Sequence, residues 1–319
     1  MKREVEPSGS KQSPEALLKL FISGGVAGCC AKTTVAPLDR VKLLLQAHNQ
    51  HYKHLGVLAT HRHVVKKEGF LGLYKGNGVQ MIRIFPYAAI QYLSFEQYKR
   101  VFKSIFPDHN HLNKLASGSI AGLTAVLFTY PLDVIRTRLA FQVKGEHVYI
   151  GMLDAARTMV SMEGGTRALY RGMTPTIIGM APYAGLSFYG FETLKNLCLE
   201  YFPSVFGKPC PQNTGGLVLI IPAKLLCGGI AGAFAQTISY PIDVVRRRQQ
   251  LYKMLPESHK YDGGMWRTLY VIYRDDGISK GLFRGLTINY VRVIPMVSVS
   301  FCVYETMKQL LGLDTGVDR

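Results

Sequence analysis

Six long stretches of the chain are dominated by apolar and small residues and hold at most one charge each. These stretches are Leu20–Leu38, Asn77–Phe95, Leu115–Leu132, Pro175–Phe191, Gly216–Ile242 and Gly285–Tyr304. Each is near the roughly 20 residues that a helix needs to cross a bilayer. They are poor in leucine and rich in Gly, Ala, Ser and Thr, which favours helices packed closely around a cavity. The pattern predicts an all-α membrane protein with six transmembrane helices. A large soluble helical protein is the alternative, but it would have to bury six such runs in its core.

The first, third and fifth stretches end in the same short motif, which begins at Pro37, Pro131 and Pro241. In each copy an acid follows the proline by two residues and a base follows it by five. The acids and bases are Asp39 with Lys42, Asp133 with Arg136, and Asp243 with Arg246. A motif that returns at such long intervals indicates a domain-sized unit repeated in tandem. The sequence therefore predicts three repeats, each with two spans.

The spacing within this proline box has a physical meaning. Proline removes a backbone donor and bends the helix. Acid and base are three residues apart, so they lie on one face of a helix. Three such helices around one axis would bring three acids and three bases together in a ring. The alternative is three local ion pairs on a solvated surface, each of which would contribute little.

The second span of each repeat ends in an aromatic residue followed by an acid and, three residues later, a lysine. These charges are Glu96, Lys99, Glu192, Lys195, Glu305 and Lys308. Because a helical hairpin returns the chain to its starting side, they form a second potential ring at the opposite face of the membrane. Between the two spans of each repeat, a polar stretch predicts a short amphipathic helix at the membrane surface, with bases toward anionic headgroups.

The net charge of the 319-residue chain is +17, which suits an anionic partner. Nucleic acid is disfavoured because the chain has no nucleic-acid-binding motif. Three cations, Lys32, Arg83 and Arg292, lie inside the spans without an acid beside them in the sequence. A charge inside a membrane is costly and indicates a functional site, here one for an anionic, phosphate-bearing substrate. Snorkelling to the headgroups is the alternative, and it fits Lys224 at the start of its span better than Arg83 or Arg292.

No catalytic set, phosphate-binding glycine loop or cofactor motif is recognisable, so an enzyme is the least favoured class and no cofactor is expected. The six cysteines form no CxxC pair and mostly lie in apolar stretches, as small core residues do. Histidines such as His48, His51 and His54 lack the acid or thiol that would complete a zinc site, and no metal is expected. The first fifteen residues mix acids with bases and resemble neither a secretory signal nor an Arg-rich transit peptide.

The three proline boxes, the three acid-glycine turns that precede the second spans, and the three aromatic-Glu-Lys boxes together resemble the mitochondrial carrier family. The resemblance covers about residues 16 to 312. It implies an N-terminal tail (1–15), carrier repeats at 16–105, 112–202 and 217–312, and a multi-pass protein of the mitochondrial inner membrane. It also implies a functional monomer with one central site used by alternating access. The proline-box charges then form the matrix gate and the second ring the cytoplasmic gate. In this family a glutamine braces the matrix gate; Gln46 and Gln250 occupy that place, and the second repeat has Ala140.

The family resemblance also implies substrate positions. They are Arg83, the pair Gly179 and Met180, Arg292, and the cavity lysine Lys32. A glycine followed by an apolar residue on the fourth span resembles carriers of adenine nucleotides. The third box runs RRRQQ, unlike that of ADP/ATP carriers, and the tail is too short for the calcium-binding domain of ATP-Mg/phosphate carriers. The sequence therefore predicts a transporter of coenzyme A or a related adenine nucleotide. ADP, ATP or another phosphorylated anion is the alternative substrate, and a non-transporting membrane scaffold is the alternative of another class.

Overall fold

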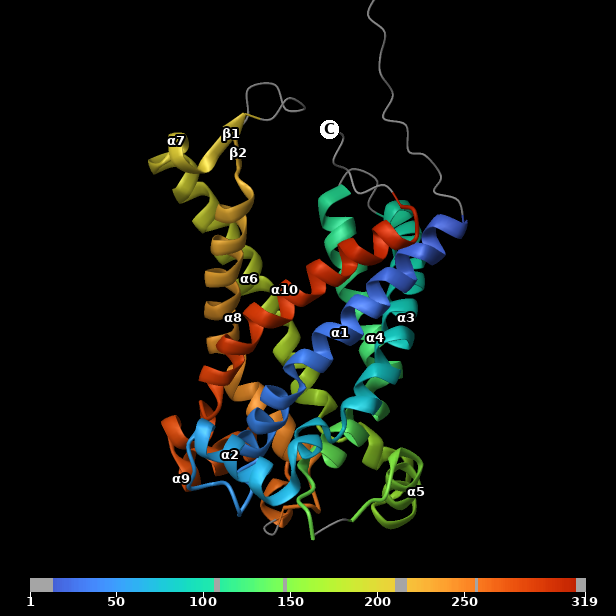
Figure 1. Cartoon of the computed structure of the whole chain (residues 1–319), viewed down its shortest axis with the longest axis vertical. Coiled ribbons are helices and arrows are strands. Elements are labelled where there is room, and N and C mark those ends of the chain that lie inside the picture. Colours follow the sequence, from blue (N-terminus) through green and yellow to red (C-terminus); the bar gives the residue numbers. More distant parts are fainter. Residues whose placement is uncertain (1–13, 106–109, 146–147, 210–216, 256–257, 314–319) are drawn as a thin grey trace, which may run out of the picture.

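The computed structural model describes residues 14–105, 110–145, 148–209, 217–255 and 258–313, so most of the predicted N-terminal tail lies outside it. Six long helices run through the described part of the chain (Figure 1). They are α1 (Pro14–Gln46), α3 (Asn77–Ile105), α4 (Asn110–Phe141), α6 (Met173–Tyr201), α8 (Ile221–Gln250) and α10 (Leu286–Leu310). The prediction of an all-α fold with six long helices is confirmed.

Each helix continues past the C-terminal end of the apolar stretch that predicted it, because the polar motif that follows continues the helix. Four segments are long and apolar enough to cross a membrane, judged by length and composition alone. These are Glu15–Gln46, Asn113–Phe141, Pro222–Gln250 and Ile278–Leu310. The start of the fifth stretch was predicted wrongly, since Leu217–Leu219 is a strand and α8 begins at Ile221. Pro222 explains the boundary: its missing N–H costs nothing in the first turn of a helix.

Shorter elements gather at the two ends of the bundle. At one end lie α2 (Val57–Glu68), α5 (Met152–Met162) and α9 (Met265–Asp276), as Figure 1 shows. They are followed by the short helices η1 (Phe70–Tyr74), η2 (Gly165–Tyr170) and η4 (Ile278–Leu282), and α9 is preceded by η3 (Ser258–Tyr261). At the other end lie α7 (Pro203–Phe206) and two short strands, β1 (Gly207–Pro209) and β2 (Leu217–Leu219). The strands pair antiparallel, with Gly207 opposite Leu219 and Pro209 opposite Leu217.

Glycine makes the turn into the second long helix of each repeat. Gly76 has φ +81° and Gly172 also has φ +81°, a conformation that side chains rarely adopt. A Cβ at Gly76 would lie 2.8 Å from the carbonyl oxygen of Arg136, and one at Gly172 would lie 3.0 Å from that of Arg246. These two turns therefore also pack against the first helix of the next repeat.

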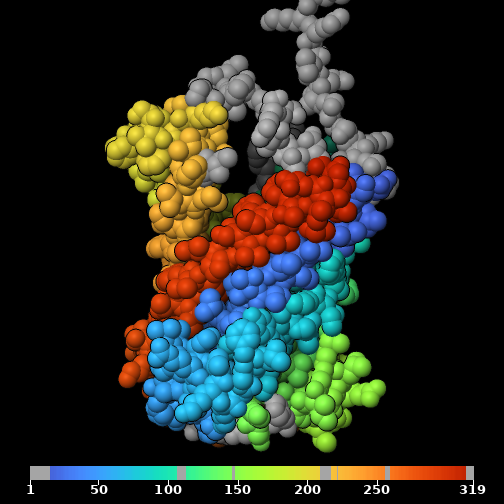
Figure 2. All heavy atoms as spheres, in the orientation of Figure 1, coloured from blue at the N-terminus to red at the C-terminus, as the bar shows by residue number. Residues whose placement is uncertain are grey.

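The long helices pack between repeats more than within them. The most extensive contacts are α3 with α4, α6 with α8, and α10 with α1. The largest apolar core lies at the end where α1 and α8 finish, and it includes Leu44, Tyr240, Leu251 and Ile272. We call this end, which carries α2, α5 and α9, the closed end. At the opposite end, the open end, α8 and α10 diverge, and Figure 2 shows the molecule notched between them.

Candidate functional site

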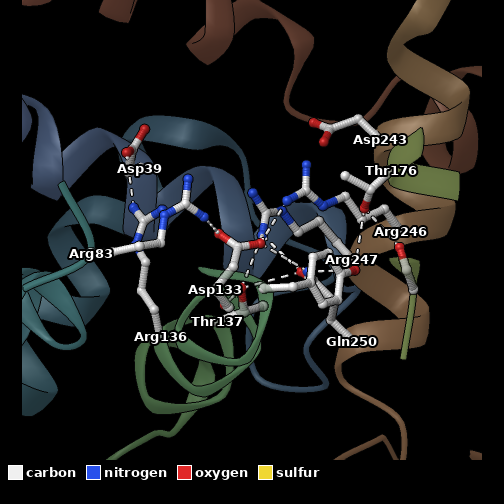
Figure 3. A network of polar contacts seen from close by, with 12 residues as sticks. Asp39, Arg83, Asp133, Arg136, Thr137, Thr176, Asp243, Arg246, Arg247 and Gln250 are labelled. Atoms are coloured by element: carbon white, nitrogen blue, oxygen red, sulfur yellow. Dashed lines mark hydrogen bonds and ion pairs between the residues drawn. The ribbon is translucent and has the colours of Figure 1, made fainter. Parts of the chain in front are cut away.

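At the closed end, the acid of each proline box meets the base of the next repeat. Asp39 lies 3.1 Å from Arg136, and Asp133 lies 2.6 Å from Arg246 (Figure 3). Asp243 closes the circle at 3.1 Å from Lys42. The charges therefore pair between helices, as a ring requires, and not along one helix. We call these six residues the proline-box network.

Two glutamines join this network, one on α1 and one on α8. Gln46 donates to Asp243 over 3.2 Å, and Gln250 donates to Asp133 over 2.9 Å. Both follow the box base by four residues, which places them one helical turn further along the same face. Ala140 holds the equivalent place in α4 and has no such donor. Two of the three acid–base pairs therefore receive a hydrogen bond from a glutamine at this position, which the third pair lacks.

Arg83 and Arg292 are not the uncompensated cations that the sequence predicted. Arg83 of α3 lies 2.6 Å from Asp133, and Arg292 of α10 lies 2.5 Å from Asp39. That expectation was wrong because it considered only acids on the same span. Asp133 is thus shared between Arg246 and Arg83, and Asp39 is shared between Arg136 and Arg292. Arg247, adjacent to a box base, adds a further contact of 3.6 Å to Asp133.

Lys32 differs from the two arginines. Its ammonium contacts the sulfur of Met296 at 3.5 Å, and no acid among the described residues lies within 4 Å of it. The side chain is half-buried on α1, five residues before Pro37. Its charge is thus the one that the neighbouring helices leave most available.

A cavity of about 270 Å³ lies directly above the proline-box network. Gly179, Met180 and Arg292 line it, together with Tyr183 and neutral side chains such as Gln236. Gly179 has a second role, because a Cβ there would lie 3.1 Å from Ile242 of α8. The glycine therefore permits close packing of α6 on α8 besides exposing backbone to the cavity.

The second predicted ring is not assembled in this structure. Lys195 pairs with Glu192 of its own helix over 2.9 Å, and both side chains are exposed. Lys308 lies over the ring of Tyr304. Glu96, Lys99 and Glu305 form no ion pair with another described residue. An ion-pair network therefore shuts one end of the molecule, whereas among the described residues the acids and bases of the second ring form no ion pair between helices at the other end.

Comparison with known proteins gives this architecture its family. The family model described as "Mitochondrial carrier protein" matches three segments, residues 13–106, 107–202 and 219–315. The chain belongs to the mitochondrial carrier family. It is therefore a transporter of the mitochondrial inner membrane, because the members of this family are transporters rather than enzymes. The members of this family carry anionic small molecules.

Several relatives align over nearly the whole carrier. Solute carrier family 25 member 16 of Mus musculus, the Graves disease carrier, is 58% identical and covers 93% of this chain and 89% of the relative. The same protein of Homo sapiens is 57% identical, with 93% and 89% covered. Mitochondrial carrier protein CoAc2 of Zea mays is 40% identical, with 97% of this chain and 91% of the relative covered.

Sequence reasoning missed three buried arginines of the carrier, one per repeat: Arg40, Arg138 and Arg248. Each pairs with the acid that follows or ends the short helix of its own repeat; these acids are Glu68, Glu163 and Asp276. The Nε of each arginine also donates to a backbone carbonyl in the last turn of the first helix of the next repeat. The acceptors are Ala140, Gln250 and Gln46, in that order, over 3.0 to 3.1 Å. Cations are favourable at helix C-termini, so these arginines join neighbouring repeats.

A signal for these arginines exists in the sequence, but its register differs between repeats. Arg40 follows its proline by three residues, whereas Arg138 and Arg248 follow theirs by seven. The difference is one helical turn, which a long side chain can span.

Burial alone would raise the pKa of Glu68, but Lys75 and Arg40 outweigh it and hold this pKa below its usual value.

Asn289 of α10 connects two parts of the site. Its Oδ1 accepts from Lys42 over 3.0 Å and from Arg292 over 2.9 Å, and the side chain is buried. Gln80 holds the same place in the first repeat, four residues after the turn glycine, and is equally buried. The Oε1 of Gln80, however, has no hydrogen-bond partner among the residues that the structure describes.

This contrast gives a matched pair of variants. Asn289→Leu removes an acceptor for two charged donors, and hydrogen bonds to charged groups contribute about 1.5–3 kcal/mol. We expect this variant to lower the melting temperature of the detergent-purified carrier. Gln80→Leu should leave it unchanged or higher, because it removes an unsatisfied oxygen. Thermal unfolding of both variants measures the difference, and equal losses would contradict the role of Asn289.

Proposed function

We propose that this carrier transports coenzyme A or a related adenine nucleotide across the inner membrane by alternating access. Two lines of support come from outside the site. The relatives include plant carriers named for coenzyme A, and the family carries anionic small molecules. The cavity lies within a single chain, so we propose the monomer as the transport unit.

The charge around the cavity supports a substrate with several phosphate groups. The proline-box network and its neighbours hold three acids, Asp39, Asp133 and Asp243. They hold seven cations, namely Lys32, Lys42, Arg83, Arg136, Arg246, Arg247 and Arg292. A phosphate monoester carries about −1.5 to −2 charge near neutral pH, so a nucleotide with a diphosphate and a further phosphate would offset much of this excess.

The sharing of box acids with Arg83 and Arg292 carries the proposal. Arg292 lines the cavity and contacts Asp39, and Arg83, which is not among the residues lining the cavity, contacts Asp133. A phosphate that draws either guanidinium toward itself weakens the hold on Asp133 or Asp39, since the planar fork of arginine serves carboxylate and phosphate alike. Substrate binding would thereby loosen the network at the closed end, which is the coupling that alternating access needs.

The conformation of the protein fits one side of this cycle. The network at the closed end is formed, and no ion pair joins two repeats at the open end within the part of the chain that the structure describes. We assign the closed end to the matrix side by analogy with the family. The structure then represents the state that receives substrate from the intermembrane space, with the matrix gate shut.

A liposome exchange screen tests the substrate. We expect coenzyme A to exchange faster than 3′-dephospho-coenzyme A, because the additional phosphate can pair with Lys32, which has no acid within 4 Å among the described residues. ADP, ATP, AMP and phosphate complete the panel. In Lys32→Met the preference for coenzyme A over its dephospho form should shrink, while Lys224→Met, at the start of α8, should keep it. Equal rates for the two forms in the unmodified carrier would contradict the assignment of coenzyme A.

ADP or ATP is the second candidate, favoured by Arg292, Gly179 and Met180 in the cavity wall. Exchange of ADP or ATP well above that of coenzyme A would select it. Exchange of no solute in the panel by a folded, incorporated carrier would favour the scaffold alternative.

A further inference from the structure

Two cysteines on helices of different repeats lie in direct contact near the open end. The sulfurs of Cys198 on α6 and Cys227 on α8 are 3.7 Å apart. Both thiols are free in the structure. Cys227 is 4% exposed, whereas Cys198 is only half-buried. They sit in a small apolar cluster with Leu219, Leu194 and Phe206.

The backbones of the two helices approach closely beside this pair. A Cβ at Gly190 of α6 would lie 3.2 Å from the Cβ of Ala231 on α8. This contact lies two helical turns from Cys198 and one from Cys227. A disulfide needs a sulfur–sulfur distance of about 2.05 Å and Cβ atoms roughly 3.5–4.5 Å apart. Side-chain rotation between two helices in close contact can supply the remaining ~1.7 Å without separating them.

We propose that Cys198 and Cys227 form a redox-responsive pair whose oxidation to a disulfide ties repeat 2 to repeat 3 and slows exchange. The oxidant is a low-molecular-weight disulfide such as glutathione disulfide. The half-buried Cys198, as thiolate, attacks one of its sulfurs and releases one thiol. Cys227, as thiolate, then attacks the Cys198 sulfur of the mixed disulfide and releases the second. The protein loses two electrons and two protons, and the small disulfide gains both as two thiols.

The position of the pair gives the bond a functional consequence. Repeats 2 and 3 are also joined at the closed end, by Asp133 and Arg246. Alternating access requires these repeats to shift against each other when that contact breaks. A covalent bond at the opposite end of the same interface would resist the shift. The effect on exchange rests on the proposed function, but formation of the bond does not.

The test uses a full-length carrier in which only this pair of thiols remains, with Cys29, Cys30, Cys210 and Cys302 replaced by serine. Cys210 lies outside the described residues, and Cys30 and Cys302 are exposed. After incubation with glutathione disulfide, peptide mapping by mass spectrometry should find Cys198 linked to Cys227. Exchange in liposomes, measured with the solute that the screen identifies, should fall severalfold, and dithiothreitol should restore it.

Two controls separate the outcomes. Adding Cys198→Ser or Cys227→Ser to this variant should leave exchange insensitive to the oxidant, and thermal unfolding should confirm that each folds. Absence of the linked peptide, or glutathione retained on Cys198, would overturn the site itself. Full linkage with unchanged exchange would overturn its effect on transport. Because the linkage is read by mass, failure of the coenzyme A assignment leaves the result on the thiol pair intact.

Discussion

Exchanging the charges of Lys42 and Asp243 together should restore transport that either reversal alone removes. Among the described residues, Lys42 is the only base within 4 Å of Asp243, and both side chains are mostly buried. Breaking such a pair costs about 3–5 kcal/mol, so Lys42→Asp and Asp243→Lys should each lower the initial exchange rate by more than about tenfold. The double variant restores an opposite-charge pair in reversed order. The rates, measured in liposomes at matched incorporation, should give a strongly non-additive double-mutant cycle.

The other pairs of the network provide the comparison. Asp133→Arg with Arg246→Asp should recover less, because Arg83 and Arg247 also contact Asp133 and would face the new arginine. Asp243→Lys combined with Lys308→Asp should show no rescue, since Lys308 belongs to the opposite ring. Additive losses in the Lys42 and Asp243 cycle would mean that the contact between repeats has no part in the gate.

Loss of either Arg83 or Arg292 should nearly abolish transport while leaving a folded protein. Arg83→Ala and Arg292→Ala each remove a cation that contacts a box acid and is proposed to bind substrate phosphate. The lost binding group should lower uptake, and the acid left with one partner fewer should weaken the network. Arg→Lys at either position should also impair uptake, because lysine lacks the planar fork that holds two oxygens at once. Uptake of labelled coenzyme A into liposomes measures both effects.

Arg274 supplies the control for this experiment. It lies on α9, its side chain is 73% exposed, and its contact with Asp275 is on the surface. Arg274→Ala changes the net charge by the same amount and should keep uptake near that of the unmodified carrier. Near-normal uptake by both Arg83→Ala and Arg292→Ala would contradict the assignment of these arginines to the substrate site.

The three proline boxes show how far the sequence alone could reach. Proline, acid and base at fixed offsets predicted a shared helix face, and their return predicted three equivalent helices around one axis. The structure pairs Asp39 with Arg136, and the other two boxes follow the same order. This succeeded because helical periodicity and threefold repetition constrain which residues can face one another.

The partners of Arg83, Arg292 and Asn289 could not be predicted in the same way. Their contacts join helices that are far apart in sequence and depend on the relative height of those helices in the bundle. An arginine side chain spans about a helical turn, so a residue count does not fix which acid it reaches. The sequence therefore placed these cations in the spans but not against Asp133 and Asp39.

The sequence by itself determined the all-α membrane architecture, the threefold repeat and the family, because each depends on patterns that local helix geometry makes visible. Only the tertiary structure decided that one end is shut, while the described charges of the second ring form no ion pair between helices. It also decided that Arg40 and its equivalents join the repeats, and that Cys198 touches Cys227. These features depend on packing between distant helices, which the order of residues along one helix does not specify.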